Sequence, residues 1–272
     1  MKLINLIEQF EPININTEEK KTRRETLSMF GDITKKLAIA TIPGALLAAV
    51  PNISKAAGNG TAAVVDVLKF ALTLEYLEKE FYQLGLQASV MTSADRPVFQ
   101  QIYDHEEAHV ALLQSTIAQL DNGNYPAKPI FDFTAGGAFN PFVVYAQFLA
   151  LSQAFEDAGV RAYKGQAGNL ISNNDVLQVA LQIHSVEARH ASQVRRLRTA
   201  KGQDTTKGWV TGASRGTMPA ATQAIYDGED VYVQATVNIS AITGVGMDAA
   251  TEAFDEPLTQ AQVLAIADPF IV

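Results

Sequence analysis

The chain carries the same four-residue constellation twice, and the second copy follows the first at a constant offset of 81 positions. Each copy has a glutamate, a tyrosine seven residues later, and then a glutamate followed three residues on by a histidine. The two sets are Glu75, Tyr82, Glu106 and His109, and Glu156, Tyr163, Glu187 and His190. At this chain's residue frequencies such a match arises by chance with a probability on the order of 1 in 10⁴, a low false-positive risk for a motif. Charged residues that merely face solvent do not explain it.

These spacings suit α-helices. Seven residues make nearly two full turns, and a step of three keeps each glutamate beside the histidine that follows it. The same faces carry apolar residues, for example Leu68 and Leu72 in line with Glu75. Four glutamates in the core of a bundle would cost a prohibitive free energy unless cations compensate their charge. Two divalent metal ions would do so, held by four carboxylates and two imidazoles.

Apolar residues recur at three- and four-residue spacing in four segments, which predicts four long helices. We expect them over about 62–89, 95–120, 140–165 and 175–200, with Asp95 as the N-cap of the second, Pro141 in the first turn of the third, and an Asx residue capping the fourth. The short first and third connections predict two antiparallel hairpins. The connection over 121–139 can reach about 60 Å when extended, more than the roughly 40 Å length of such a helix. We therefore predict an all-α four-helix bundle with a long middle crossover.

Composition excludes several classes of protein. The formal charge of −8 and the pI near 5.0 argue against a nucleic-acid-binding surface, where Lys and Arg would have to neutralise phosphates. The chain has no cysteine, which rules out disulfides, iron–sulfur clusters and thiol nucleophiles. Any bound metal must therefore use oxygen and imidazole ligands. The one basic run is expected to face the dipole at a helix C-terminus rather than to form a binding patch; it comprises Arg195, Arg196, Arg198 and Lys201.

Residues 1–56 do not read as part of the core. TRRETLSMF (22–30) places paired arginines before the apolar run LAIATIPGALLAAV (37–50), and small residues follow. This order resembles a twin-arginine export signal. Pro43 interrupts the apolar run, which is shorter than the roughly 20 residues of a spanning helix, so no stable membrane span is expected. We expect export to a periplasmic or extracellular location and a mature chain beginning near Ala57; an uncleaved cytoplasmic or membrane-tethered N-terminus is the alternative.

The motifs LTLEYLEKEFY, HEEAH and SVEARH within residues 62–200 resemble the ferritin-like superfamily. Together with the tail EPLTQAQVLAIADPFIV they are similar to its bacterial ferritin-like, desiccation-related branch. The resemblance implies a ferritin-like four-helix bundle that binds two divalent ions, iron or manganese. It also implies the ligand roles: Glu75 with His109, and Glu156 with His190, each bind one metal, while Glu106 and Glu187 bridge. Residues 201–272 are expected to form a C-terminal extension of loops and short helices. A chain with such an extension is less expected to assemble with other copies into a hollow shell that stores metal.

Other polar residues near the motifs are expected to lie outside the ligand set. Glu78 shares a face with Glu75, but its counterpart in the second copy is Gly159, so we expect it beside the site or at the surface. His105 is expected to be a polar exterior residue, since it lies about 100° around the helix from Glu106. His184 lies one turn before Glu187, and a role beside the ligands or in proton handling is the less favoured alternative for it. Asp157 and Arg161 are expected to form an i,i+4 surface pair.

Two classes of function fit this pattern. The first is an oxidoreductase whose metal pair reacts with dioxygen or peroxide in oxidative or desiccation stress. The second is a non-enzymatic metal-binding or stress-protective bundle, and a weaker third is a bundle whose extension binds a partner. Tyr82 and Tyr163 are expected to hydrogen-bond the carboxylates, and a catalytic redox role is the alternative for both. The sequence leaves a homo-oligomer open.

Overall fold

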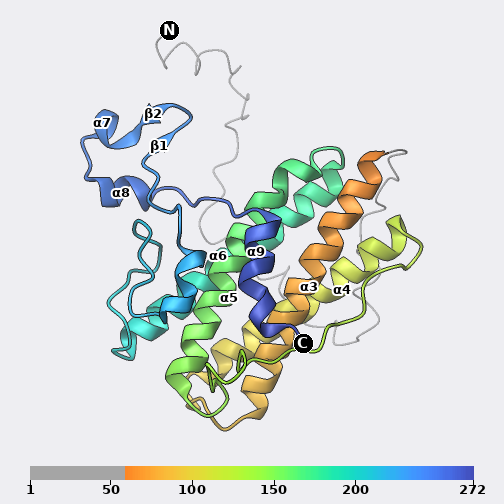
Figure 1. Cartoon of the computed structure of the whole chain (residues 1–272), viewed down its shortest axis with the longest axis horizontal. Coiled ribbons are helices and arrows are strands. Elements are labelled where there is room, and N and C mark those ends of the chain that lie inside the picture. The colour runs from red at the N-terminus through yellow and green to blue at the C-terminus, as the bar shows by residue number, and fades with distance from the viewer. Residues whose placement is uncertain (1–58) are drawn as a thin grey trace, which may run out of the picture. The chain divides into compact units, whose positions relative to one another are not determined.

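The structure is a computed structural model that describes residues 59–272. Four long helices form its centre: α3 (Asn59–Gln87), α4 (Arg96–Leu120), α5 (Tyr145–Gln166) and α6 (Asn174–Ala200) (Figure 1). The prediction of an all-α four-helix bundle is confirmed. None of the described helices is both long enough and apolar enough to cross a bilayer. The tail and export signal predicted over 1–56 lie outside the described residues.

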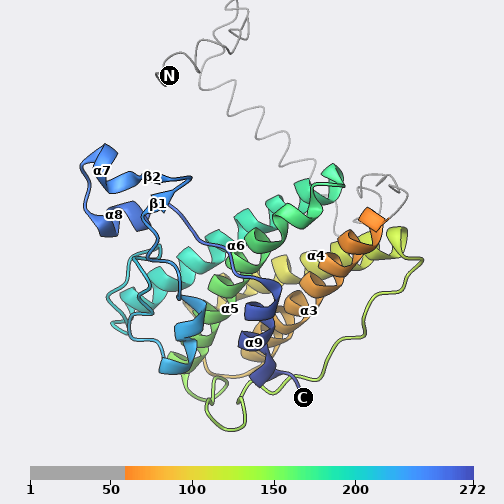
Figure 2. The same ribbon diagram turned by 45° about the horizontal axis from the view of Figure 1, so that its top comes forward.

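The helices pair as two hairpins, with α3 packed mainly on α4 and α5 mainly on α6. The connection between α5 and α6 is short and contains the 3₁₀ helix η2 (Ala167–Leu170). The connection from α4 to α5 is long and runs beside the bundle (Figures 1 and 2). On its way it meets the C-terminus, where Phe131 forms an antiparallel bridge with Ile271. The predicted middle crossover is therefore confirmed.

Helix α5 begins at Tyr145, five residues later than predicted. Asn140, the predicted start, closes a turn instead, because its carbonyl oxygen accepts the backbone N–H groups of Val143 and Val144 at 3.2 and 2.9 Å. Val144 then has an extended backbone, with φ −110° and ψ 104°, which interrupts any helix before Tyr145. Pro141 thus lies in this turn rather than in the first turn of α5.

Asp95 occupies the N-cap position of α4, as predicted, but it has helical backbone angles and its side chain makes no capping bond. Its carboxylate instead accepts hydrogen bonds from the hydroxyls of Thr92 and Tyr145 at 2.7 and 2.9 Å. It also pairs with Lys201 at 2.7 Å. Asp95 therefore ties the start of α4 to the start of α5 and the end of α6. At α6 the predicted Asx cap is present, in the form of Asn173.

The C-terminal extension after α6 consists of short elements joined by loops. They are η3 (Ala220–Ile225), β1 (Val233–Gln234), β2 (Val237–Asn238), α7 (Ile239–Thr243), α8 (Met247–Thr251), α9 (Gln260–Ala267) and η4 (Asp268–Phe270). Strands β1 and β2 pair antiparallel, with Val233 opposite Asn238. The extension packs on the bundle ahead of α9, where the backbone N–H of Leu258 donates to the carbonyl of Arg161 at 3.1 Å. Gly165 permits this contact, because a Cβ there would overlap the carbonyl oxygen of Leu258.

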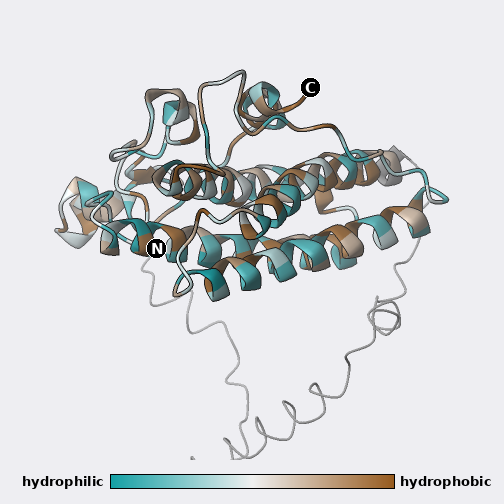
Figure 3. Cartoon of the chain, turned by 90° about the horizontal axis from the view of Figure 1, so that it is seen from below, coloured by the Kyte–Doolittle hydropathy of each residue, from teal (hydrophilic) through white to brown (hydrophobic). Residues whose placement is uncertain are grey.

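Buried apolar side chains fill both ends of the bundle. One group comes from the start of α3 and the end of α4 and includes Leu72, Leu113 and Ile117. The other comes from the end of α3 and the starts of α4 and α5, and it is rich in aromatic rings such as Phe81 and Phe148, which stack at 4.9 Å. Figure 3 shows hydrophilic and hydrophobic residues alternating along the long helices, as amphipathic helices require. The stretch between the two apolar groups carries the polar residues described next.

Candidate metal centre

Six side chains of the repeated constellation converge in the middle of the bundle. They are Glu75 from α3, Glu106 and His109 from α4, Glu156 from α5, and Glu187 and His190 from α6. The four glutamates are fully buried, and the two histidines are 8% and 5% exposed. They form two groups that share Glu106 and Glu187, and within each group one potential ligand atom per residue lies within 4.8 Å of the others.

The histidine rings face several carboxylates at once. Nδ1 of His109 lies 3.2 Å from Glu75, 3.0 Å from Glu106 and 3.3 Å from Glu187. Nδ1 of His190 lies 3.0 Å from the second oxygen of Glu106 and 3.1 Å from Glu156. One ring nitrogen can donate only one proton, so hydrogen bonding alone does not satisfy this arrangement. Glu106 reaches both histidines, one with each oxygen.

Three buried carboxylate oxygens have no donor in hydrogen-bond geometry, although a histidine nitrogen lies near two of them. The three are Oε1 of Glu106 and both oxygens of Glu187, the two residues common to both groups. Buried polar atoms in folded proteins nearly always have a partner, and those that lack one call for an explanation such as an ion. Oxygen and imidazole donors gathered around such atoms suit divalent cations of the iron and manganese type. The residues present therefore fit a pair of metal ions.

The protein groups alone leave the site with unbalanced charge. Burial raises the pKa of Glu106 to about 7, although interactions with the rings of His109 and His190 oppose this. Burial and the charge of Glu106 raise the pKa of Glu187 well above its usual value. Burial would lower the pKa of His190, but the charge of Glu156 and hydrogen bonds to the carboxylates outweigh it and raise that pKa to about 11. Without cations the site therefore holds protons on its carboxyl and imidazole groups.

Both repeated tyrosines contact the site, and each does so across the bundle. The hydroxyl of Tyr82 on α3 donates to Glu156 on α5, and the hydroxyl of Tyr163 on α5 donates to Glu75 on α3. Burial, followed by the charge of the carboxylate that each one contacts, raises both tyrosine pKa values well above their usual range. Both phenols therefore stay protonated as donors. They fix the orientation of the two outer carboxylates.

His105 is not the exterior residue that its helix position suggested. It is half-buried, and its Nδ1 lies 2.9 Å from Nε2 of His190, with the two rings stacked at 5.2 Å. A rotation of about 100° from Glu106 points His105 toward α6 rather than toward solvent. Since the partner of a ligating histidine's second nitrogen fixes its ring, His105 positions His190. Only knowledge of the packing of α4 on α6 would have identified it.

Glu78 lies beside the site and not at the surface, since it is 3% exposed. Burial and the charge of Glu187 raise its pKa well above the usual value. Gly159, its counterpart in the second copy, explains how it fits. A Cβ at Gly159 would lie 3.1 Å from Glu78 and 3.2 Å from Glu187. The break in the repeat thus leaves room for two carboxylates. His184 lies outside both candidate ligand groups.

Asp157 and Arg161 do not form the expected surface pair, because both are buried and have other partners. Asp157 accepts a 2.6 Å hydrogen bond from Tyr226 and pairs with Arg195. Arg161 pairs with Glu229 at 2.8 Å. The C-terminal extension covers this side of α5 and α6 and supplies Tyr226 and Glu229.

The basic run lies at the C-terminal end of α6, as predicted, with Arg198 in the last turn, but part of it is covered by the C-terminal extension. Two of its members, Arg195 and Arg198, are buried. Arg195 pairs with Asp157, and Arg198 pairs with Asp204 of the extension at 2.9 Å. The charges of these two arginines are therefore neutralised by specific carboxylates, and the helix dipole is not their main partner.

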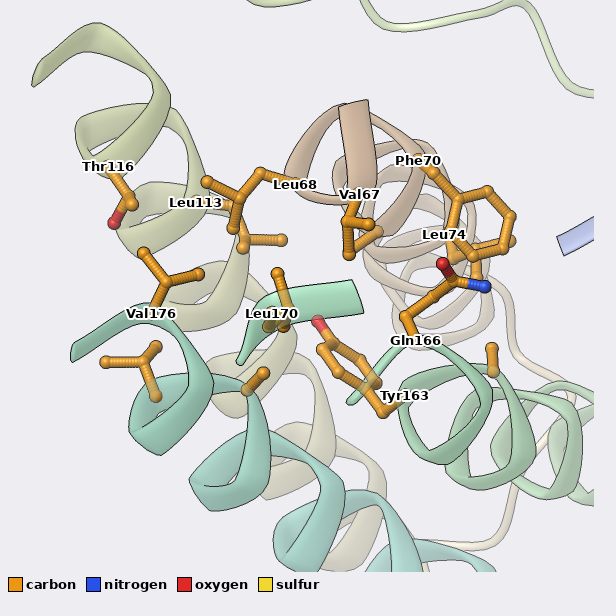
Figure 4. Close-up of a pocket in the computed structure, with 14 residues that line it drawn as sticks. Val67, Leu68, Phe70, Leu74, Leu113, Thr116, Tyr163, Gln166, Leu170 and Val176 are labelled. Atoms are coloured by element: carbon orange, nitrogen blue, oxygen red, sulfur yellow. The ribbon is translucent and has the colours of Figure 1, made fainter. Parts of the chain in front are cut away.

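An apolar cavity of about 20 Å³ lies next to the site, at the end of the bundle formed by the start of α3 (Figure 4). Val67, Leu68, Leu113 and Leu170 are among the side chains that line it. Tyr163, whose hydroxyl donates to Glu75, is also among the residues that line it. A water molecule in this cavity would lack the polar partners that buried waters require.

Comparison with known protein families identifies one match. The family model described as a ferritin-like domain matches residues 63–200, just over half of the chain. The matched region contains all eight residues of the repeated constellation. No curated protein sequence matches the chain.

Proposed function

Because the chain belongs to the ferritin-like domain family, we propose that it is a dinuclear metal carboxylate protein that reacts with dioxygen or peroxide. The observation that carries the proposal is the set of unpartnered buried oxygens on Glu106 and Glu187, which lie in both groups of candidate ligands. Four carboxylates and two neutral imidazoles would balance the charge of two divalent cations. Iron and manganese both suit this donor set.

We assign the six residues by their positions. Glu75 with His109 would bind one metal, and Glu156 with His190 the other, since each pair lies within 3.2 Å. Glu106 would bridge, because its two oxygens face different histidines. Glu187, the other residue shared by both groups, would bridge opposite it. When bound, such a metal pair supplies the electrons that reduce an oxidant.

The remaining residues orient the ligands and exclude water. Tyr82 and Tyr163 hold Glu156 and Glu75 by hydrogen bonds, and apolar groups fill the bundle on both sides. The apolar cavity that Tyr163 helps to line supports dioxygen as the oxidant, because this molecule is small and apolar. A role for the two tyrosines as redox groups is part of the proposal and rests on their contact with the ligating carboxylates.

We further propose that the protein acts outside the cytoplasm in defence against oxidants or desiccation. This part rests on the twin-arginine pattern in residues 22–30 and on the motifs shared with the desiccation-related branch. Protein recovered from its native host should begin near Ala57. Mature material that still begins at Met1 would contradict export.

One experiment separates an enzyme from a metal-binding protein. Metal content is measured on natively purified protein, and the loaded protein is then supplied with dioxygen and, separately, with hydrogen peroxide. We expect two metal ions per chain and repeated consumption of one oxidant. Two metals without any consumption would leave the non-enzymatic function. Fewer than two would contradict the dinuclear site.

A further inference from the structure

Residues 231–247, which we term the uncharged segment, form β1, β2, α7 and the start of α8. Their 17 residues contain no Asp, Glu, Lys, Arg or His. Six large apolar side chains are nevertheless exposed on them: Val231, Val233, Val237, Ile242, Val245 and Met247. Figures 1 and 2 both show these elements as a group that stands away from α3 and α4. They do not all share one face, because Val237 pairs with Gln234 and therefore points to the other side of the hairpin from Val233. So many exposed apolar side chains in one short segment nevertheless commonly mark an interaction surface.

The uncharged segment is ordered by its own contacts. Strands β1 and β2 pair, Asn238 caps α7, and the hydroxyl of Ser240 donates to the carbonyl of Val245 at 2.6 Å. A two-stranded hairpin is only marginally stable in water, however. Its turn also places Thr236, a β-branched residue, at φ 71°, which is unfavourable. Contact with another surface would stabilise the hairpin and remove its apolar side chains from water.

We propose that the uncharged segment is the surface through which two copies of this chain associate. The chain has a net charge of −8, so two copies repel each other over most of their surface. The repulsion is least where both surfaces lack charge. A two-fold contact presents the same patch from each copy, and an uncharged apolar patch is complementary to itself.

The flanking charges argue against a lipid surface. Exposed Asp227, Asp230 and Asp248 border the uncharged segment. Anionic headgroups are bound by Lys and Arg clusters, which this segment lacks. The same acidic border predicts a salt effect: added salt should strengthen association between two copies by screening the aspartates, whereas it would weaken the contact with a basic partner.

The test measures the mass of the full-length protein by sedimentation equilibrium over a range of concentrations and two salt levels. Ile242 is replaced by Glu and, separately, by Lys. The matched controls carry the same changes at Ile171, which is 71% exposed compared with 68% for Ile242 and lies outside the uncharged segment. Both positions are exposed within one chain, so all four variants should fold, which circular dichroism checks.

We expect a dimer for the unchanged protein and for both Ile171 variants, and tighter association at higher salt. Ile242→Glu and Ile242→Lys should both raise the dissociation constant by about tenfold or more, because either charge would be buried at the contact. A monomer at every concentration would overturn the proposal, as would a dimer that the Ile242 changes leave intact. Co-sedimentation of a monomeric protein with phosphatidylglycerol vesicles, lost in both Ile242 variants, would assign the surface to lipid instead. Neither the mass measurement nor the vesicle assay depends on bound metal, so both test this surface independently of the proposed dinuclear site.

Discussion

The hydroxyl of Tyr82 on α3 donates a hydrogen bond to the carboxylate of Glu156 on α5, which belongs to the other hairpin. Tyr163 and Glu75 repeat this contact in the opposite direction. Each hairpin therefore orients an outer carboxylate of its neighbour. These two bonds join the halves of the bundle at the level of the site.

Tyr82→Phe should destabilise the metal-free protein. The change leaves an oxygen of Glu156 buried without a donor, which costs about 1–3 kcal/mol. Tyr103→Phe is the control, since its hydroxyl makes only an exposed 3.3 Å contact with Glu107. Urea unfolding of both variants measures the difference. Equal free energies of unfolding would show that the hydrogen bond contributes nothing to stability.

Glu106→Ala should lower the metal content to fewer than two ions per chain. It removes the carboxylate that faces both His109 and His190. Helical content should persist, because the remaining buried carboxylates can take up protons, while metal-dependent oxidant consumption is lost. Glu107→Ala is the neighbouring control, since Glu107 is exposed and pairs with Lys79. Full metal occupancy in Glu106→Ala, or an equal loss in Glu107→Ala, would mean that the paired motif is misread.

Gly159→Ala should weaken metal binding without unfolding the bundle. The added methyl group would press on carboxylate oxygens of Glu78 and Glu187, which lie 3.1 and 3.2 Å from its position. Displacing groups around a metal ligand commonly lowers affinity about 10- to 100-fold. Gly168→Ala is the control, because a Cβ there meets no atom within 4 Å. Competition with a chelator gives both affinities, and similar values for the two variants would contradict the prediction.

The metal-free protein should lose stability as the pH rises. Burial raises the pKa of Glu106 from 4.5 to about 7, which favours the protonated carboxyl in the folded state. The stability that this proton contributes is complete below pH 4.5 and is lost as the pH rises through 7. Burial alone would lower the pKa of His190, but the charge of Glu156 outweighs it and raises that pKa from 6.5 to about 11. The stability contributed by the proton on His190 is therefore lost as the pH rises through 11. Urea unfolding in the presence of a chelator measures the decline.

Two comparisons test whether the decline in stability comes from protons bound at the site. Glu106→Gln should flatten the part of the decline that falls between pH 4.5 and 7. Metal-loaded protein should show a weaker pH dependence, because the cations replace the protons. Stability of the metal-free protein that increases over this pH range would contradict the assignment of protons to the site.

The repeated constellation can be found in the sequence because it depends only on the spacing of residues along the chain. The spacing within each helix places Glu106 beside His109 whatever surrounds them, and the constant offset distinguishes the pair from an ordinary solvated helix. Which residues face one another across helices is not local. His105 contacts His190, and Glu78 occupies the space left by Gly159, only because particular helices meet at particular angles.

The structure differs most from the sequence predictions where the C-terminal extension covers the bundle. Asp157 and Arg161 have the spacing of a surface ion pair, yet Tyr226 and Glu229 bind them from more than 60 residues away. Spacing within one helix holds no information about such partners. Helix α5 starts later than the sequence predicts for a different, local reason, since the extended backbone at Val144 overrides the helix-starting preference of Pro141.

The crosswise contacts of the tyrosines bear on how such a chain could have arisen. Each hairpin alone has two glutamates, one tyrosine and one histidine of the site, but its tyrosine contacts a glutamate that only the other hairpin supplies. An ancestor of half this length could have built the same centre only by pairing with an identical molecule. Gene duplication and fusion would then have made the second hairpin permanent. The two halves are not identical now, since Glu78 in one stands where Gly159 stands in the other.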